Sequence, residues 1–134
     1  MDEIHISRTN QTPEFIFNPA GIIKIVGRGL FNDKPEFTNQ LLSWIEEYLR
    51  NPAKVTQVTI AFEYLNSLST IILVTLLQSL SRITGKSKTL IIKWYYEDDD
   101  EEILERGKYI AFSFDIPIEF IITDDISICL LPEW

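Results

Sequence analysis

One short polar turn holds the side chains that are most able to take part in chemistry. It contains an amide and three hydroxyls, in Asn66, Ser67, Ser69 and Thr70. A hydroxyl can attack a substrate when a base activates it, or it can accept a phosphoryl group. A Ser-His-Asp relay would need the one histidine, His5, which precedes the first predicted core strand and is poorly placed as a general base. The turn therefore favours a hydroxyl that accepts a phosphoryl group from another protein over a hydroxyl that acts as a catalytic nucleophile.

The same turn also has a simple structural explanation. Asn and Ser are preferred helix caps because their side chains satisfy N–H groups at the start of a helix. Spacing alone favours this capping role. A phosphoryl group on Ser67 would nevertheless be well placed, because the N–H groups and the positive dipole end of a helix attract anions. Both roles can coexist, with Asn66 as the cap and Ser67 as the acceptor.

The remaining candidate motifs do not indicate an enzyme, a metal site or a cofactor site. Gly27, Arg28 and Gly29 lack the third glycine of a dinucleotide fingerprint. The acidic run at residues 97–102 lacks the glycine and the spaced glutamate of a calcium loop, so it is interpreted as a solvated helix N-terminus. Cys129 lies in an apolar segment, which is typical of a packed thiol. We expect a protein that is not an enzyme and binds neither metal nor cofactor.

Composition limits the class of partner. The chain has 134 residues, of which 46% are hydrophobic, and its net charge is −8. Such a chain suits one domain over residues 1–134, with residues 1–10 mobile and residues 124–134 as an extra tail. An acidic chain without a basic stripe is unsuited to nucleic acid or anionic membranes. Residues 1–5 do not resemble a secretory signal, and no apolar run approaches the ~20 residues that span a bilayer, so we expect a cytoplasmic protein.

The elements that position the turn follow from hydrophobic patterning. Strands are predicted at residues 14–17, 21–26, 55–62, 89–96 and 118–122, with a short edge strand at 4–6. Residues 18–21 carry a turn signal, so strands 14–17 and 21–26 are predicted to form a β-hairpin. Helices are predicted from Pro35 to about residue 50, over 68–83 with Gly85 as the cap, and over 103–112. This order predicts an α/β domain with a mixed, mostly parallel sheet of about five strands and helices packed on it. Residues 124–134 would add an edge strand or cover an apolar face.

Topology places the turn at a functional edge. Right-handed crossovers make strands 55–62, 89–96 and 118–122 parallel neighbours. Sites in open α/β sheets lie beyond the carboxyl ends of the strands, where Asn66 and Ser67 fall. The following helix is apolar almost all round, so it is either buried on two sides or presents a partner-binding face.

The chain resembles the SiaC family of bacterial regulatory phosphoproteins, which are related in fold to STAS domains and anti-sigma-factor antagonists. The resemblance runs along most of the chain and rests on a set of short segments: Thr12 and Pro13; Gly21 and its following strand; Trp44 and Tyr48; residues 64–69; Trp94, Tyr95 and Tyr96 with Asp98, Asp99 and Asp100; and Gly107. Two of these segments, the Tyr-x-Asn-Ser-x-Ser pattern of residues 64–69 and the aromatic and acidic residues of 94–100, indicate this family only in combination.

The resemblance implies a partner-switching protein without enzyme activity. A Ser/Thr kinase would phosphorylate the hydroxyl that follows the asparagine, which is Ser67 here, and a metal-dependent phosphatase would remove the phosphate. The unmodified form would bind a downstream signalling protein, which in this family can be a diguanylate cyclase. The residues expected to shape the turn or contact partners are Tyr64, Leu65, Asn66, Leu68, Ser69, Thr70 and Ile71.

Two single positions and one loop depart from the family pattern. Ile71 stands where the family commonly has lysine, Lys108 replaces an acid, and residues 29–33 differ from the usual loop. Two other functions fit the same pattern of elements. One is a small-ligand or nucleotide-binding domain that uses the same sheet edge, and the other is an oligomerisation domain whose apolar helix and tail are buried in a homodimer.

Overall fold

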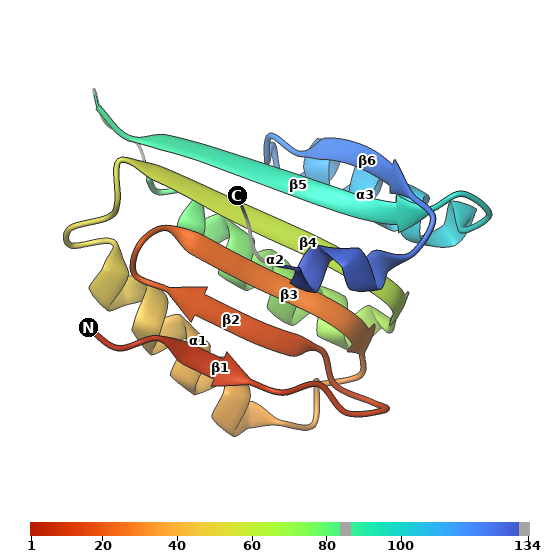
Figure 1. Cartoon of the computed structure of the whole chain (residues 1–134), viewed down its shortest axis with the longest axis horizontal. Helices are drawn as coiled ribbons and strands as arrows, with labels where there is room; N and C mark the ends of the chain where they lie inside the picture. Colours follow the sequence, from red (N-terminus) through yellow and green to blue (C-terminus); the bar gives the residue numbers. More distant parts are fainter. Residues whose placement is uncertain (84–86, 132–134) are drawn as a thin grey trace.

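A computed structural model of the chain describes residues 1–83 and 87–131 (Figure 1). The strands are β1 (Ile4–Ile6), β2 (Glu14–Asn18), β3 (Ile22–Gly29), β4 (Val55–Leu65), β5 (Thr89–Glu97) and β6 (Glu119–Thr123). The helices are α1 (Pro35–Tyr48), α2 (Ser67–Leu80) and α3 (Glu101–Ser113), followed by a short 3-10 helix, η1 (Ile126–Leu130).

The strands form one sheet in the order β1-β2-β3-β4-β5-β6. The first three strands are antiparallel, and β3 to β6 are parallel neighbours. The predicted α/β class and the predicted parallel order are therefore confirmed. The sheet has six strands rather than about five, because β1 pairs with β2 along its length.

The predicted hairpin between β2 and β3 is confirmed. The Asn18 side chain accepts a hydrogen bond from the Ala20 N–H at 2.8 Å, and the Gly21 N–H donates to the Asn18 carbonyl at 3.0 Å. Gly21 has φ +100°, and a Cβ there would lie 2.3 Å from the Val55 carbonyl oxygen. Glycine is therefore needed at this turn.

The three α-helices cover one face of the sheet, because the parallel crossovers all proceed in the same direction (Figure 1). In α2 the side chains of Leu73, Leu76 and Leu77 are fully buried against the core. Leu68 and Ile71, in contrast, are 57% and 62% exposed. The all-round apolar character of α2 thus has two causes, a broad buried face and a separate exposed edge.

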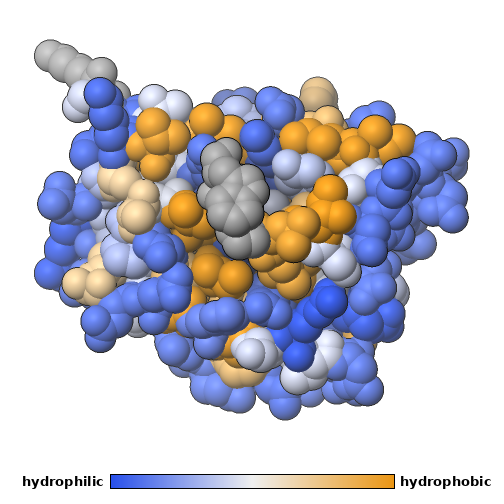
Figure 2. All heavy atoms as spheres, viewed as in Figure 1, coloured by the Kyte–Doolittle hydropathy of each residue, from blue (hydrophilic) through white to orange (hydrophobic). Residues whose placement is uncertain are grey.

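The other face of the sheet carries η1, which covers the middle strands (Figure 1). Ile126 and Cys129 pack against Val26 and Ala61, so the tail covers an apolar face and forms no edge strand among the described residues. The buried Lys24 ammonium donates to the carbonyl of Cys129 at 2.9 Å. On this face apolar side chains gather around η1, surrounded by polar ones (Figure 2).

The end of α2 differs from the prediction. The helix ends at Leu80 with Ser81 as its cap, three residues before the predicted end at 83, and Gly85 lies outside the described residues. The Ser81 hydroxyl donates to the Leu77 carbonyl at 2.8 Å, and the Arg82 N–H bonds to Ser79 rather than continuing the α-helical pattern. No helix in the described part of the chain is long and apolar enough to cross a membrane.

Candidate functional site

The polar turn lies where β4 ends and α2 begins, at the carboxyl edge of the parallel strands. The start of α3 follows the carboxyl end of β5 and lies at the same edge. The Asp100 carboxylate caps α3 by accepting from the Ile103 N–H at 3.1 Å, and two further acids occupy its first turn. The predicted role of the acidic run as a helix N-terminus is confirmed for Asp100, Glu101 and Glu102, whereas Glu97 is the last residue of β5 and its carboxylate accepts from the Ile126 N–H.

Asn66 is the N-cap of α2, as predicted from its type and position. Its backbone is extended, with φ −79° and ψ 165°, and its side-chain oxygen accepts from the Ser69 N–H at 2.8 Å. The amide nitrogen donates to the side-chain oxygen of Asn32 at 2.8 Å. Asn66 therefore joins the helix start to the loop that follows β3.

Ser69 and Thr70 also serve the local structure. The Ser69 hydroxyl is fully buried, accepts from the Phe31 N–H at 2.9 Å and lies 3.3 Å from the Asn32 side-chain oxygen. Thr70 is 8% exposed, and its hydroxyl donates to the Asn66 carbonyl at 2.8 Å. Because both hydroxyls are buried and bonded, neither is available to an enzyme in the folded protein.

Ser67 differs from the other two hydroxyls of the turn. It is the first residue of α2 and is exposed. Its hydroxyl forms no side-chain hydrogen bond with any residue in the ranges 1–83 and 87–131. Of the three hydroxyls in the turn, that of Ser67 is therefore the accessible one.

The apolar residues around the turn divide into exposed and buried members. Leu68 and Ile71 are exposed, and Tyr64 is 41% exposed with the Arg28 guanidinium 5.4 Å from its ring centroid. The prediction that Leu65 contacts partners is wrong, because Leu65 is buried and only 3% exposed. Gly29 on the adjacent strand leaves room for it, since a Cβ there would lie 2.5 Å from Leu65 Cδ1.

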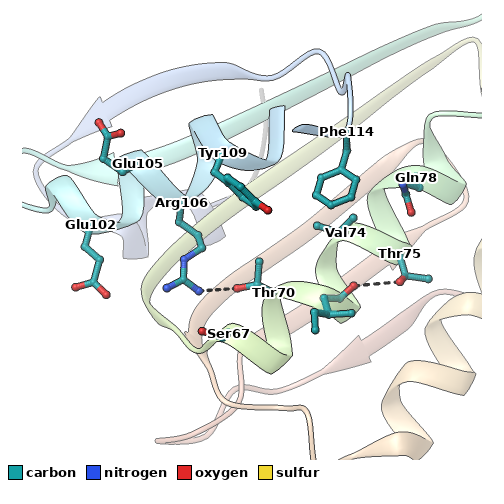
Figure 3. Close-up of a pocket in the computed structure, with 11 residues that line it drawn as sticks. Ser67, Thr70, Val74, Thr75, Gln78, Glu102, Glu105, Arg106, Tyr109 and Phe114 are labelled. Atoms are coloured by element: carbon teal, nitrogen blue, oxygen red, sulfur yellow. Dashed lines mark hydrogen bonds between the residues drawn. The ribbon is translucent and has the colours of Figure 1, made fainter. Parts of the chain in front are cut away.

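A groove of about 700 Å³ runs between α2 and α3 beside the turn (Figure 3). Ser67 lies at the end of the groove where α2 begins. The residues that line it are Ser67, Thr70, Ile71, Val74, Thr75 and Gln78 from α2, and Glu102, Glu105, Arg106, Tyr109 and Phe114 from α3 and its cap. Its surface is mostly apolar, so the groove suits a side chain or helix of a partner better than a highly charged small molecule.

Arg106 is the one cation among the described residues that line this groove. Its guanidinium reaches from α3 to α2 and donates to the Thr70 hydroxyl at 2.8 Å (Figure 3). Arg106, Tyr109 and Phe114 line the groove but are not predicted as site residues from the sequence. Glu102, Arg106 and Tyr109 have the spacing of residues on one face of a helix, which the sequence shows. That spacing does not indicate which other helix or strand packs beside this face.

Removing the cap should weaken the site without abolishing the fold. We expect Asn66→Ala to lower the free energy of unfolding by about 1 kcal/mol, because the Ser69 N–H loses its acceptor. Asn66→Asp keeps that acceptor but places a carboxylate oxygen against the Asn32 side-chain oxygen until the Asn32 amide turns its nitrogen toward it, so it should be less destabilised than Asn66→Ala. Denaturant unfolding of the two variants measures the difference. Equal losses would show that the cap bond contributes nothing.

Comparison with known proteins places this arrangement in a family. A model of the SiaC family of regulatory phosphoproteins matches residues 6–123. An uncharacterized protein of Pseudomonas aeruginosa is 23% identical over 106 residues, which cover 78% of this chain and 84% of that protein.

Two solved structures from Pseudomonas aeruginosa share the fold. Apo-SiaC superposes with a TM-score of 0.75 at 22% identity, covering 92% of this chain and 99% of that one. The complex of the diguanylate cyclase SiaD with its activator SiaC gives a TM-score of 0.79 at 20% identity, covering 90% and 99%. With the family match extending over both the turn and the groove, the chain belongs to the SiaC family of regulatory phosphoproteins.

Proposed function

We propose that the chain is a partner-switching regulator without enzyme activity, controlled by phosphorylation of Ser67. A Ser/Thr kinase adds the phosphate and a phosphatase removes it. The observation that carries the proposal is the contrast within the turn, where Ser67 is exposed and the hydroxyls of Ser69 and Thr70 are buried and bonded. A modification at Ser67 leaves these structural hydrogen bonds in place.

The proposed mechanism is electrostatic. A phosphoserine carries close to two negative charges at neutral pH. Next to Ser67 lie the exposed apolar side chains of Leu68 and Ile71, together with the groove. A partner that covers these side chains excludes water from them, and burying a phosphate in the same contact is strongly unfavourable. The unmodified form therefore binds, and the phosphorylated form is released.

A diguanylate cyclase is the proposed class of downstream partner. Support comes from the SiaC relative, which is described as the activator of the diguanylate cyclase SiaD and has been crystallised with it. The switch would operate in the cytoplasm, where kinase, phosphatase and nucleotide substrate are present together. Partner choice depends on the exposed residues, including Ile71, which departs from the family pattern.

Phosphosite mapping of the chain isolated from its host tests the proposal. We expect a phosphorylated fraction at Ser67. A cyclase of the same organism should be recovered with Ser67→Ala and lost with Ser67→Asp. An unmodified Ser67, together with equal recovery by both variants, would contradict the proposal. A stable homodimer that recovers no cyclase would instead favour the oligomerisation function, and a thermal shift with one nucleotide would favour ligand binding.

A further inference from the structure

We propose that Arg106 is the internal receptor for a phosphate on Ser67 and holds it in the groove between α2 and α3. This inference rests on the proposed modification of Ser67 and adds how the chain itself recognises its modified state. Arg106 lies on α3 and Ser67 is the first residue of α2, so the two are 39 positions apart in the sequence.

The geometry of α2 brings the two groups together. Ser67 and Thr70 are three residues apart on one helix, so they are surface neighbours with about 5–6 Å between their Cβ atoms. The Arg106 guanidinium is already fixed at this spot by its 2.8 Å hydrogen bond to the Thr70 hydroxyl. All three residues line the same groove (Figure 3).

Among the described residues, no carboxylate lies within ion-pair distance of the Arg106 guanidinium. Glu102 and Glu105 line the same groove and are exposed. The one group it contacts through a side-chain hydrogen bond in this part of the chain is the neutral hydroxyl of Thr70.

A phosphate offers a much better partner than that hydroxyl. Arg binds phosphate through two parallel N–H···O bonds, and such charge-assisted bonds are roughly twice as strong as neutral ones. The guanidinium is partly buried, which reduces screening by solvent. Phosphorylation would thus turn Arg106 from Thr70 toward the phosphate and tie α3 to the first turn of α2.

This contact has a consequence for the partner. A phosphate held by Arg106 lies inside the groove rather than in bulk solvent, so it occupies space that a partner side chain would otherwise use. Without Arg106 the phosphate is free to extend outward, and the two acids of the groove repel it. Arg106 would therefore determine where the negative charge is placed.

The test measures the second pKa of the phosphate directly. Phosphoserine is installed at position 67 during translation, so that no kinase is needed. The phosphorus NMR signal is then followed against pH in the otherwise unchanged chain and in Arg106→Gln, Arg106→Lys and Lys108→Gln. Lys108→Gln removes the same charge from an exposed position of the same helix and is the matched control.

We expect the phosphate pKa to be about one unit lower in the unchanged chain than in Arg106→Gln, because a bound guanidinium stabilises the dianion. The dipole of α2 lowers this pKa, and Glu102 and Glu105 raise it, in every variant. Lys108 lies 3.9 Å from the Glu105 carboxylate in an exposed pair, so its removal changes the effect of Glu105 only slightly. Lys108→Gln should match the unchanged chain. Arg106→Lys, which keeps the charge and loses the bidentate bonds, should lie between the two, and it supplies the result if Arg106→Gln fails to fold.

Equal pKa values in the unchanged chain and both Arg106 variants would overturn the inference. A rise of similar size in Lys108→Gln would also overturn it, since the effect would then be general charge rather than contact. These outcomes are separate from the proposed function. Loss of partner binding on phosphorylation can persist without Arg106, and a lowered pKa can be found in a chain whose partner binding does not change.

Discussion

Replacing Gly107 with alanine is expected to lower the free energy of unfolding by about 2 kcal/mol, although the change is made in a helix. Gly107 lies in α3 where this helix packs on the sheet. An added Cβ would lie 2.7 Å from Cε2 of Trp94 and 2.8 Å from Cε1 of Phe120. Neither contact is one that a real Cβ makes, so both aromatic rings, or the helix itself, must move.

Two effects of opposite sign compete in this substitution. Helix propensity alone favours alanine over glycine by about 1 kcal/mol. Trp94, however, is fully buried, and its indole N–H donates to the Ile103 carbonyl at 3.2 Å. A ring held in this way cannot move without breaking that bond or distorting the core. The steric cost therefore exceeds the gain in propensity.

Denaturant unfolding measures this change, and thermal unfolding should show a midpoint lower by about 5–8 °C. Lys108→Ala places alanine at the neighbouring exposed position and should leave stability nearly unchanged. Trp94→Leu removes one of the two clashing rings, so the double variant should lose less stability than the sum of the two single changes. A stabilised Gly107→Ala variant would show that α3 packs differently.

Replacing Ile71 with glutamate is expected to weaken binding of the proposed cyclase partner at least tenfold, or by about 1.4 kcal/mol. Ile71 is 62% exposed at the rim of the groove, so the change removes an apolar contact and places a charge in it. The fold should tolerate the variant, because the side chain is not part of the core.

Isothermal titration of the purified partner checks this result. Gln40→Glu adds the same charge at an exposed position of α1 and serves as the matched control, with unchanged affinity expected. If Ile71→Glu binds as tightly as the unchanged chain, the partner lies elsewhere. The apolar surface near η1, which includes Ile128 at 51% exposure, would then be the next candidate.

Much of the fold could be predicted because local patterns and topology agree. The β-branched run that becomes β4, the turn at Gly21 and the alternation of strands and helices all indicate a mostly parallel sheet. The cap role of Asn66 could be predicted as well, because it depends only on residues next to it in the sequence.

Contacts between distant elements could not be predicted in the same way. The Asn32 side chain joins Asn66 and Ser69, and Arg106 joins Thr70, across 30 or more positions. Burial of Leu65 depends on Gly29 of the neighbouring strand. Each of these depends on which residues face each other after folding, and hydrophobic periodicity carries no such information.

We propose that the phosphorylation state of Ser67 controls partner binding. Its most direct test is the dissociation constant of the purified diguanylate cyclase with unmodified chain and with chain carrying phosphoserine only at position 67. Phosphoserine at Ser43, an exposed position of α1, provides the control for added charge. We predict at least a tenfold higher dissociation constant for the Ser67 form alone. Equal dissociation constants for all three proteins would contradict the account.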